Sequence, residues 1–227
     1  MNTSMKKVAI ILAAGKSQRF GNSDKMLHQI ASQNIISLTV KTFLDSNIFD
    51  KIVVVASKGN FNEIVQYTQQ IASDIEIIFG GDRRQDSVKC ALDFLGDAYD
   101  YLAIHDGARP FVSNLMIKKG LEMLQNSDSA IPGYPISDTI KFVEDEIVIK
   151  NFDRQNLFLV QTPQFFLYKK FYAAYQKDIP DMTDDATLFV DLGLKVIVFE
   201  GDKMNVKLTD ESDLKIFEQI YDMKLDE

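Results

Sequence analysis

A continuous apolar run near the start of the chain, residues 8–14, passes directly into a loop of small and basic residues. A run of this kind is typical of a strand buried on both faces, so it favours a sheet with helices on both sides. Ala13, Ala14 and Gly15 leave the backbone N–H groups of the loop open to an anion. Three cations follow: Lys16, Arg19 and Lys25. This order predicts a phosphate-binding loop, and the alternative is a solvated basic loop.

Two familiar phosphate loops do not match this segment. The P-loop of nucleoside triphosphatases needs a glycine five residues before Gly15, where this chain has Ile10. The dinucleotide fingerprint needs three spaced glycines, and only Gly15 and Gly21 are present. An acid placed for a ribose after the second strand is also missing, which disfavours an NAD-dependent oxidoreductase. The remaining interpretation is a cationic loop for the triphosphate of a nucleotide that is itself cut.

The composition fits one globular domain, residues 1–227, because 46% of the chain is hydrophobic and can form a full core. The net charge of −8 argues against nucleic-acid binding, which needs a basic face. The first apolar run is too short for a membrane span and lacks a cleavage-type signal. Cys90, the single cysteine, is expected to be buried and inert, which indicates a reducing compartment. We therefore expect a cytoplasmic protein that binds neither nucleic acid nor membrane.

Short apolar runs alternate with segments of helical spacing, as in residues 35–44 and 88–95. This alternation predicts an α/β fold with a doubly wound, mostly parallel sheet. Ligands of such sheets bind beyond the carboxyl ends of the strands, so the loops there are the candidate site. The expected strands are residues 8–12, 52–56, 75–79, 101–104, 129–131 and 196–199.

One region, residues 137–160, breaks this alternation. Its β-rich runs, 139–143 and 147–149, flank the acidic turn 144–146, which is typical of a hairpin. We expect the hairpin to leave the body as an arm. Because an apolar arm needs a partner surface, a second copy of the chain is the simplest partner.

The loop after residues 75–79 carries groups suited to a nucleotide base. Gly80 and Gly81 would let the backbone approach a flat ligand, and Asp82 or Ser87 could add polar contacts. An ordinary capped turn would give the same pattern, and this alternative stays open.

The loop after residues 101–104 carries a candidate metal ligand. Asp106 suits a Mg²⁺ ion held by one or two carboxylates plus substrate phosphates, with Arg109 as its electrostatic neighbour. Lys207 adds a cation after the last expected strand. Asp184 and Asp185 are each interpreted as a cap or a surface ion pair. Without a cysteine cluster, the two histidines make a zinc site improbable, and they are interpreted as a polar edge residue, His28, and strand-end scaffolding, His105.

Several short motifs follow one another along nearly the whole chain: Ala13-Ala14-Gly15 with Arg19 and Lys25, Gly80-Gly81-Asp82 with Asp86-Ser87-Val88, His105-Asp106-Gly107-Ala108-Arg109-Pro110, Asp138-Thr139, Asp153-Arg154, Thr162-Pro163-Gln164 and Thr183-Asp184. No single motif is decisive, but the ordered set is specific. It resembles the 2-C-methyl-D-erythritol 4-phosphate cytidylyltransferase family. The resemblance implies a Rossmann-like nucleotidyltransferase sheet with a β-arm that locks a homodimer. It also implies that CTP and methylerythritol phosphate give a CDP-linked alcohol and pyrophosphate in the non-mevalonate route to isoprenoids.

The resemblance also implies roles for particular residues. Arg19 and Lys25 would hold the triphosphate and stabilise the transition state, and Lys207 would assist at the α-phosphate. Asp106 would bind Mg²⁺, and Arg109 would have a structural role or lie at the substrate-binding edge of the site. Thr139 and Arg154 would reach from the arm into the neighbouring subunit and bind methylerythritol phosphate. The cytidine site would be lined by Ala13, Ala14, Gly15, Gly81, Asp82 and Ser87.

The chain departs from the family pattern at a few positions, and two other functions stay open. Asp24 and Met26 flank Lys25 where the family usually has proline and glutamine, and Met204 replaces a frequent aspartate. One alternative is a ribitol 5-phosphate cytidylyltransferase, which tends to differ at the motifs 86–88 and 153–154. The other is a non-catalytic nucleotide-binding regulatory protein, which would not need all of the cations and the acid assigned above.

Overall fold

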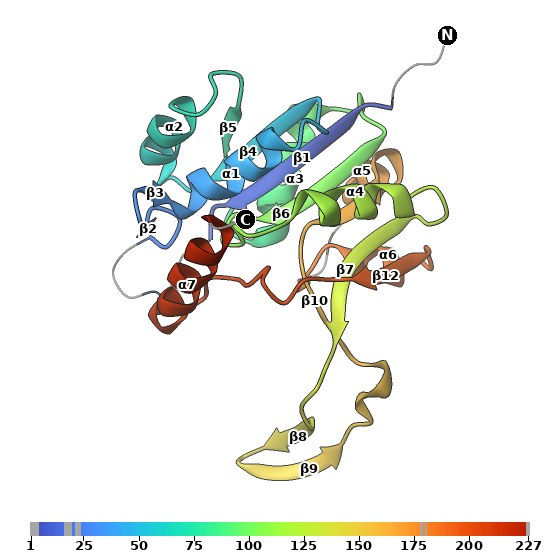
Figure 1. The fold of residues 1–227 in the computed structure, drawn as a ribbon. Helices are drawn as coiled ribbons and strands as arrows, with labels where there is room; N and C mark the ends of the chain where they lie inside the picture. The colour runs from blue at the N-terminus through green and yellow to red at the C-terminus, as the bar shows by residue number, and fades with distance from the viewer. Residues whose placement is uncertain (1–4, 16–19, 21–23, 178, 180, 226–227) are drawn as a thin grey trace.

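The computed structural model describes residues 5–15, 20, 24–177, 179 and 181–225. Within them an eight-stranded sheet forms the centre of the molecule (Figure 1). β1 lies parallel between β4 and β6, in the middle of the sheet. The strands follow one another as β5 (Glu76–Phe79), β4 (Lys51–Ala56), β1 (Lys7–Ala13), β6 (Tyr101–Asp106), β11 (Gln164–Leu167), β7 (Ser129–Pro135) and β10 (Phe158–Val160), and β12 (Val196–Glu200) also pairs with β7.

The central strand β1 is buried on both faces, as its apolar run predicts. Its alternate side chains enter two separate hydrophobic cores, with Ile11 on one side of the sheet and Ile10 on the other. The first core contains residues of α1 (Ile35–Asp45), α2 (Phe61–Gln69), α4 (Asn114–Met123) and α7 (Leu214–Leu225). The second contains residues of α3 (Arg84–Leu95), α5 (Tyr168–Tyr175) and α6 (Ala186–Asp191). Helices therefore cover both faces, and the predicted doubly wound α/β fold is confirmed.

The sheet also contains two strands that the sequence pattern does not predict. β11 runs antiparallel between β6 and β7, and β10 runs antiparallel to β7. β11 is short and begins with the polar Gln164, although Phe165 and Phe166 enter opposite cores. Six strands match the predicted apolar runs: β1, β4, β5, β6, β7 and β12. Two further strands of two residues each, β2 (Gln29–Ile30) and β3 (Gln33–Asn34), come between β1 and α1 in the sequence. They pair with each other and are not part of the main sheet.

The predicted hairpin arm is present. β8 (Lys141–Glu144) pairs antiparallel with β9 (Ile147–Asn151) through the turn Asp145-Glu146, whose residues both have positive φ. The hairpin projects away from the main sheet (Figure 1), and every residue of both strands is exposed. The chain then passes through the 3₁₀ turn η1 (Arg154–Asn156) and returns to the sheet at β10. The arm therefore holds apolar side chains that its own body does not cover.

Cys90 and His28 are half-buried, whereas His105 is fully buried. Cys90 is half-buried on α3, so the expectation of a buried thiol is corrected; partial burial, with the charge of Asp93, raises its pKa. The fully buried side chains of α3 include Val88 and Leu92 but not Cys90. The ring of His28 packs nearly perpendicular to the Phe20 ring, and His105 lies at the end of β6. Among the described residues, no helix has the length and apolar character that a membrane crossing requires.

Candidate active site

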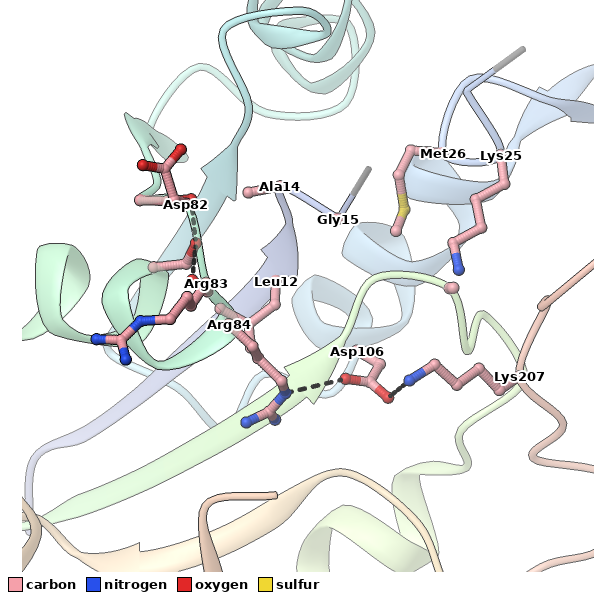
Figure 2. Close-up of a pocket in the computed structure, with 13 residues that line it drawn as sticks. Leu12, Ala14, Gly15, Lys25, Met26, Asp82, Arg83, Arg84, Asp106 and Lys207 are labelled. Carbon is pink, nitrogen blue, oxygen red and sulfur yellow. Dashed lines mark hydrogen bonds and ion pairs between the residues drawn. The ribbon is translucent and has the colours of Figure 1, made fainter. Parts of the chain in front are cut away.

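A pocket lies at the carboxyl ends of β1 and β6, where the sheet type places ligands (Figure 2). Most of the predicted nucleotide and catalytic residues line it. Ala13 lies one position behind, buried at the end of β1, and its carbonyl accepts a hydrogen bond from the Asn60 amide at 2.9 Å. Arg19 lies outside the described residues. The predicted residues that do line the pocket are Ala14, Gly15, Lys25, Gly81, Asp82, Ser87, Asp106 and Lys207.

The glycine pair after β5 is required by close packing against the start of α3. A Cβ added to Gly81 would lie 2.4 Å from the Cβ of Asp86, and one added to Gly80 would lie 2.6 Å from the Ser87 hydroxyl oxygen. Real Cβ atoms do not approach neighbours so closely, so larger residues would push this wall of the pocket outward. The loop is also a capped turn, because Asp86 accepts a hydrogen bond from the Arg83 N–H. The capped-turn interpretation of this loop is therefore confirmed, and its contact with a nucleotide base stays a prediction.

Three cationic side chains surround the carboxylate of Asp106 in the pocket. One of its oxygens lies 2.7 Å from the Lys207 ammonium and 3.6 Å from Nε of Arg109, and the other lies 3.9 Å from Nε of Arg84. Burial alone would raise the pKa of this carboxyl, but Lys207, then Arg84 and Arg109, outweigh burial and hold it well below its usual range. Figure 2 shows Arg84 and Lys207 approaching Asp106 from opposite sides. The group is therefore ionised throughout the neutral pH range.

His105 fixes the position of Asp106 from beneath. Its Nε2 lies 2.9 Å from the Arg109 carbonyl, which can only accept, so this nitrogen carries the proton. Nδ1 must then accept from the Thr162 hydroxyl at 3.1 Å, and the same hydroxyl accepts from the Asp106 N–H at 3.0 Å. Desolvation lowers the pKa of His105 to about 4, so the ring is neutral at pH 7. The scaffolding interpretation of His105 is confirmed.

The unusual neighbour Asp24 ties Lys25 to the body. Its carboxylate accepts from the Met26 N–H at 2.9 Å and from the Asn60 amide at 2.7 Å, the amide that also bonds to Ala13. The Lys25 ammonium donates to the Leu208 carbonyl at 3.0 Å. Asp24 is therefore part of the framework that positions the loop. Met204, the other departure, packs against the hydrophobic core, and Lys207 pairs with Asp106 without it.

A second pocket lies next to the first. Three residues line both pockets and form the wall between them: Arg84, Asp106 and Lys207. Arg109 lines it, as predicted for the edge of the site, and its guanidinium donates to the Asn205 carbonyl at 2.7 Å. The remaining lining residues come mainly from the segments around β11 and α6: Val160, Gln161, Thr162, Gln164, Thr183 and Asp184. Two concave cationic sites therefore meet at one carboxylate.

Arg84 and Asp185 are site residues that the sequence interpretation missed. Asp185 is fully buried, and its carboxylate lies 2.6 Å from the Arg84 guanidinium, so the expected surface ion pair or cap is wrong for this residue. Asp184 does accept from the Thr187 N–H near the start of α6, as a capping group would, and it also binds Gln164. The only signal in the sequence was the acid pair directly before the apolar residues of α6. It could not reveal a partner about a hundred positions away.

Thr139 and Arg154, the two substrate residues predicted on the arm, line neither pocket of their own chain. Both are exposed, and the Arg154 guanidinium donates to the Ser137 carbonyl within the arm. Among the described residues no cluster of three or more His, Cys, Asp or Glu side chains could hold a metal ion.

A doubly wound sheet whose strand ends form two adjoining cationic pockets defines the class, an α/β nucleotidyltransferase. Residues 7–223 match the profile of the 2-C-methyl-D-erythritol 4-phosphate cytidylyltransferase family. The chain is 38% identical to the enzyme of that name from Dictyoglomus thermophilum, covering 95% of this chain and 96% of the relative. It is 35% identical to that from Clostridioides difficile, covering 95% and 93%. The chain therefore belongs to the 2-C-methyl-D-erythritol 4-phosphate cytidylyltransferase family.

Solved structures agree with this assignment. The 4-diphosphocytidyl-2C-methyl-D-erythritol synthase of Anaerococcus prevotii superposes with a TM-score of 0.84 at 26% identity, covering 96% of this chain and 99% of that one. The 2-C-methyl-D-erythritol 4-phosphate cytidylyltransferase of Francisella tularensis gives a TM-score of 0.81 at 29% identity, covering 95% and 99%. The similarity thus extends over the sheet and the arm together.

Proposed function

We propose that this chain catalyses the reaction for which its family is named: it transfers CMP from CTP to 2-C-methyl-D-erythritol 4-phosphate and releases pyrophosphate. The observation that carries this proposal is the shared wall of the two pockets, Arg84, Asp106 and Lys207. One pocket has the glycine-lined wall that suits a nucleotide, and the other has room for a second phosphorylated molecule. A site of this form brings two anions together, which is the main difficulty of the reaction.

The chemistry needs no general base on the protein. A phosphate monoester is already largely a dianion near neutral pH, since its second pKa is about 6. Its oxygen attacks the α-phosphorus of CTP, and the bond from that phosphorus to the β-phosphate oxygen breaks, so that pyrophosphate leaves. His105 is neutral and fully buried within its hydrogen bonds, which suits a framework role rather than proton transfer. The protein contributes positioning and charge stabilisation.

We assign the charge stabilisation to the cations of the two loops. Lys25, near the start of the chain, and Lys207, near its end, both line the first pocket. The Lys25 ammonium is held by the Leu208 carbonyl and the Lys207 ammonium by Asp106. Arg19, outside the described residues, is assigned to the triphosphate by family position. Ala14, Gly15, Gly81, Asp82 and Ser87 line the wall assigned to cytidine, with Ala13 supporting it from β1.

We also propose that Asp106 binds Mg²⁺ together with the triphosphate. The donor set fits, because the carboxylate is ionised, and Mg²⁺ is commonly held by one or two carboxylates plus substrate phosphates. The ion would supply neutralisation of the charge on the phosphates. Lys207, now 2.7 Å from Asp106, would then turn its ammonium toward the phosphates.

The arm suggests that the acceptor site is completed by a second copy of the chain. Phe142 and Ile147 keep 45% and 65% of their surface exposed among the described residues, on a hairpin that projects away from the sheet (Figure 1). We propose that the arm packs on a partner subunit and brings Thr139 and Arg154 to the partner's second pocket. A homodimer of this kind would have two composite sites.

The decisive measurement is pyrophosphate release with CTP and Mg²⁺, comparing methylerythritol phosphate with ribitol 5-phosphate. We expect selective turnover of methylerythritol phosphate and a loss of about 10³-fold in kcat/KM for Lys25→Ala, because a cation at the reacting phosphates is removed. Lys51→Ala is the matched control, since Lys51 is ion-paired with Glu76 at the opposite end of the sheet. Turnover of ribitol 5-phosphate alone would change the acceptor. Tight CTP binding without turnover would favour a regulatory protein.

A further inference from the structure

Arg84 occupies the boundary between the two pockets. It is the first residue of α3, and it lines the pocket assigned to the nucleotide as well as the pocket assigned to the acceptor. A quarter of its side chain remains exposed. The guanidinium of the adjacent Arg83 points away from Asp106 (Figure 2). It forms ion pairs with Asp86 at 2.8 Å and Asp181 at 2.9 Å. The fold therefore separates two neighbouring arginines and sends one of them to the boundary.

A buried acid anchors the Arg84 guanidinium from behind. Nη1 of Arg84 lies 2.6 Å from Oδ2 of Asp185, which has no exposed surface. The other oxygen of Asp185 accepts from the hydroxyl of Tyr175 at 3.0 Å, and that ring is 1% exposed. Burying an ion pair generally adds little stability compared with apolar residues of the same volume. Stability alone thus does not account for an acid at this position, whereas aiming a cation does.

Among the contacts given for the described residues, Nε of Arg84 makes no hydrogen bond to the protein. Nε of Arg84 lies 3.9 Å from Asp106, which is longer than a hydrogen bond. Asp106 makes its close contact with Lys207 at 2.7 Å instead. A phosphate oxygen at the boundary would find an N–H donor of the kind that arginine offers to phosphates. A cation held at this point can also reduce the repulsion between two phosphorylated substrates.

We propose that Arg84 binds phosphate oxygens of both substrates at the boundary of the two pockets, and that Asp185 and Tyr175 are positioning residues that hold its guanidinium there. The identity of the substrates rests on the function proposed above. Arg84 would act on both, because a group on the shared wall faces whatever occupies either side. This distinguishes it from Lys25, which lines only the first pocket, and from Arg109, which lines only the second.

The first test is steady-state kinetics of Arg84→Gln and Arg84→Lys. We expect Arg84→Gln to lower kcat/KM about 10²–10³-fold and to raise the KM for CTP and for methylerythritol phosphate together. Arg84→Lys keeps the charge but not the planar fork, so it should recover only part of the loss. An increase of only one KM would overturn the shared role.

The positioning role is tested by two matched tyrosine variants on α5. Tyr175→Phe removes the hydroxyl that holds Asp185, whereas Tyr168→Phe removes an equally buried hydroxyl that donates to the Gly96 carbonyl at 2.5 Å, away from both pockets. We expect Tyr175→Phe to lower kcat/KM about fivefold to twentyfold and Tyr168→Phe to leave it unchanged, with comparable losses in Tm for both. Equal effects of the two on kcat/KM would overturn the proposal. Asp185→Asn extends the series, with Tyr175→Phe as the milder variant should it fail to fold.

Equilibrium titrations separate this proposal from the proposed function. CTP and methylerythritol phosphate are each titrated alone into the wild type and into Arg84→Gln by calorimetry. A tenfold or greater weakening of both would support the role of Arg84 even if the wild type gave no turnover. An unchanged Kd for either ligand would overturn that role even if the wild type were fully active.

Discussion

The end of the sheet and the arm position their side chains in opposite ways. Asp106 is fixed by Lys207 at 2.7 Å and by the Thr162 hydroxyl at 3.0 Å, all within one chain. In β8 and β9 every residue is exposed. Within the described part of the chain, the hydrogen bond given for Arg154 goes to a backbone carbonyl of the arm itself, that of Ser137. The position of a pocket residue such as Asp106 is therefore fixed by contacts within a single chain. The arm residues Thr139 and Arg154 line neither pocket of their own chain, so their predicted role in substrate binding depends on a second copy.

The largest effect should come from removing the charge at the centre of the body site. Asp106→Asn keeps the size of the side chain but leaves Lys207, Arg84 and Arg109 without their shared anion. We expect kcat/KM to fall about 10³-fold or more, by the same factor at any protein concentration. Asp128→Asn is the control, because Asp128 is ion-paired with Lys170 at 2.6 Å away from the pockets. If Asp106→Asn kept more than about a tenth of the activity, Asp106 would not have the central role assigned to it.

A second test concerns the stability that the buried framework contributes. His105 takes up a proton near pH 6.5 when unfolded but only near pH 4 when folded, because desolvation lowers its pKa. The unfolded state thus binds the proton first, so this contribution is complete above pH 6.5 and is lost as the pH falls toward 4, by roughly 3 kcal/mol. We expect His105→Gln to lack this component when the free energy of unfolding is measured in denaturant across that range. Identical pH slopes for the variant and the wild type would contradict the buried hydrogen-bond chain.

A third test combines a variant of the arm with a variant of the pocket, because each chain would then supply the part that the other lacks. We expect Arg154→Ala to lower kcat/KM for the acceptor about tenfold to a hundredfold and to leave CTP affinity unchanged, because it loses charge-assisted contacts to one substrate. Arg154→Ala and Lys25→Ala mixed together should recover activity, since one site of each mixed dimer combines an intact body with an intact arm. At equal concentrations about a quarter of all sites would be restored. No recovery on mixing would mean that each site is made by a single chain.

The smallest effect is expected at the edge of the body site. Asp24→Ala removes the hydrogen bonds to the Met26 N–H and the Asn60 amide, so the segment around Lys25 loses its attachment to β1. We expect the KM for CTP to rise less than tenfold and the free energy of unfolding to fall by about 1–2 kcal/mol. Asp24→Asn, which keeps an acceptor for Met26, should lie between this variant and the wild type. A larger loss than that of Lys25→Ala would mean that Asp24 acts on the substrate itself.

Much of the fold could be predicted because its signals are local. Buried strands such as β1 and β4 are continuous apolar runs, and the hairpin is marked by two β-rich segments around an acidic turn. The acid at the end of β6 and the glycine pair after β5 follow from the rule that parallel strands gather their loops at one edge. These features need only a few neighbouring residues to be recognised.

The missed features depend on contacts between distant segments. β11 has four residues, and its place between β6 and β7 is set by Phe165 and Phe166 entering opposite cores. The Arg84–Asp185 pair joins the start of α3 to the start of α6, and neither residue carries a local sign of burial. The effect of Asp24 on Lys25 could not be predicted from the sequence, because the partner of Asp24, Asn60, belongs to the turn before α2. Tertiary packing, rather than propensity, decided all three.

The wall shared by the two pockets also determines how this site could be inhibited. Two separate ligands each lose their translational freedom on binding, whereas a single compound that fills both pockets loses it once. Its two halves reach their pockets at a high effective concentration, and Arg84, Asp106 and Lys207 meet one linking group instead of two repelling ends. A compound that joins a cytidine part to a polyol part across this wall should therefore bind more tightly than either fragment alone.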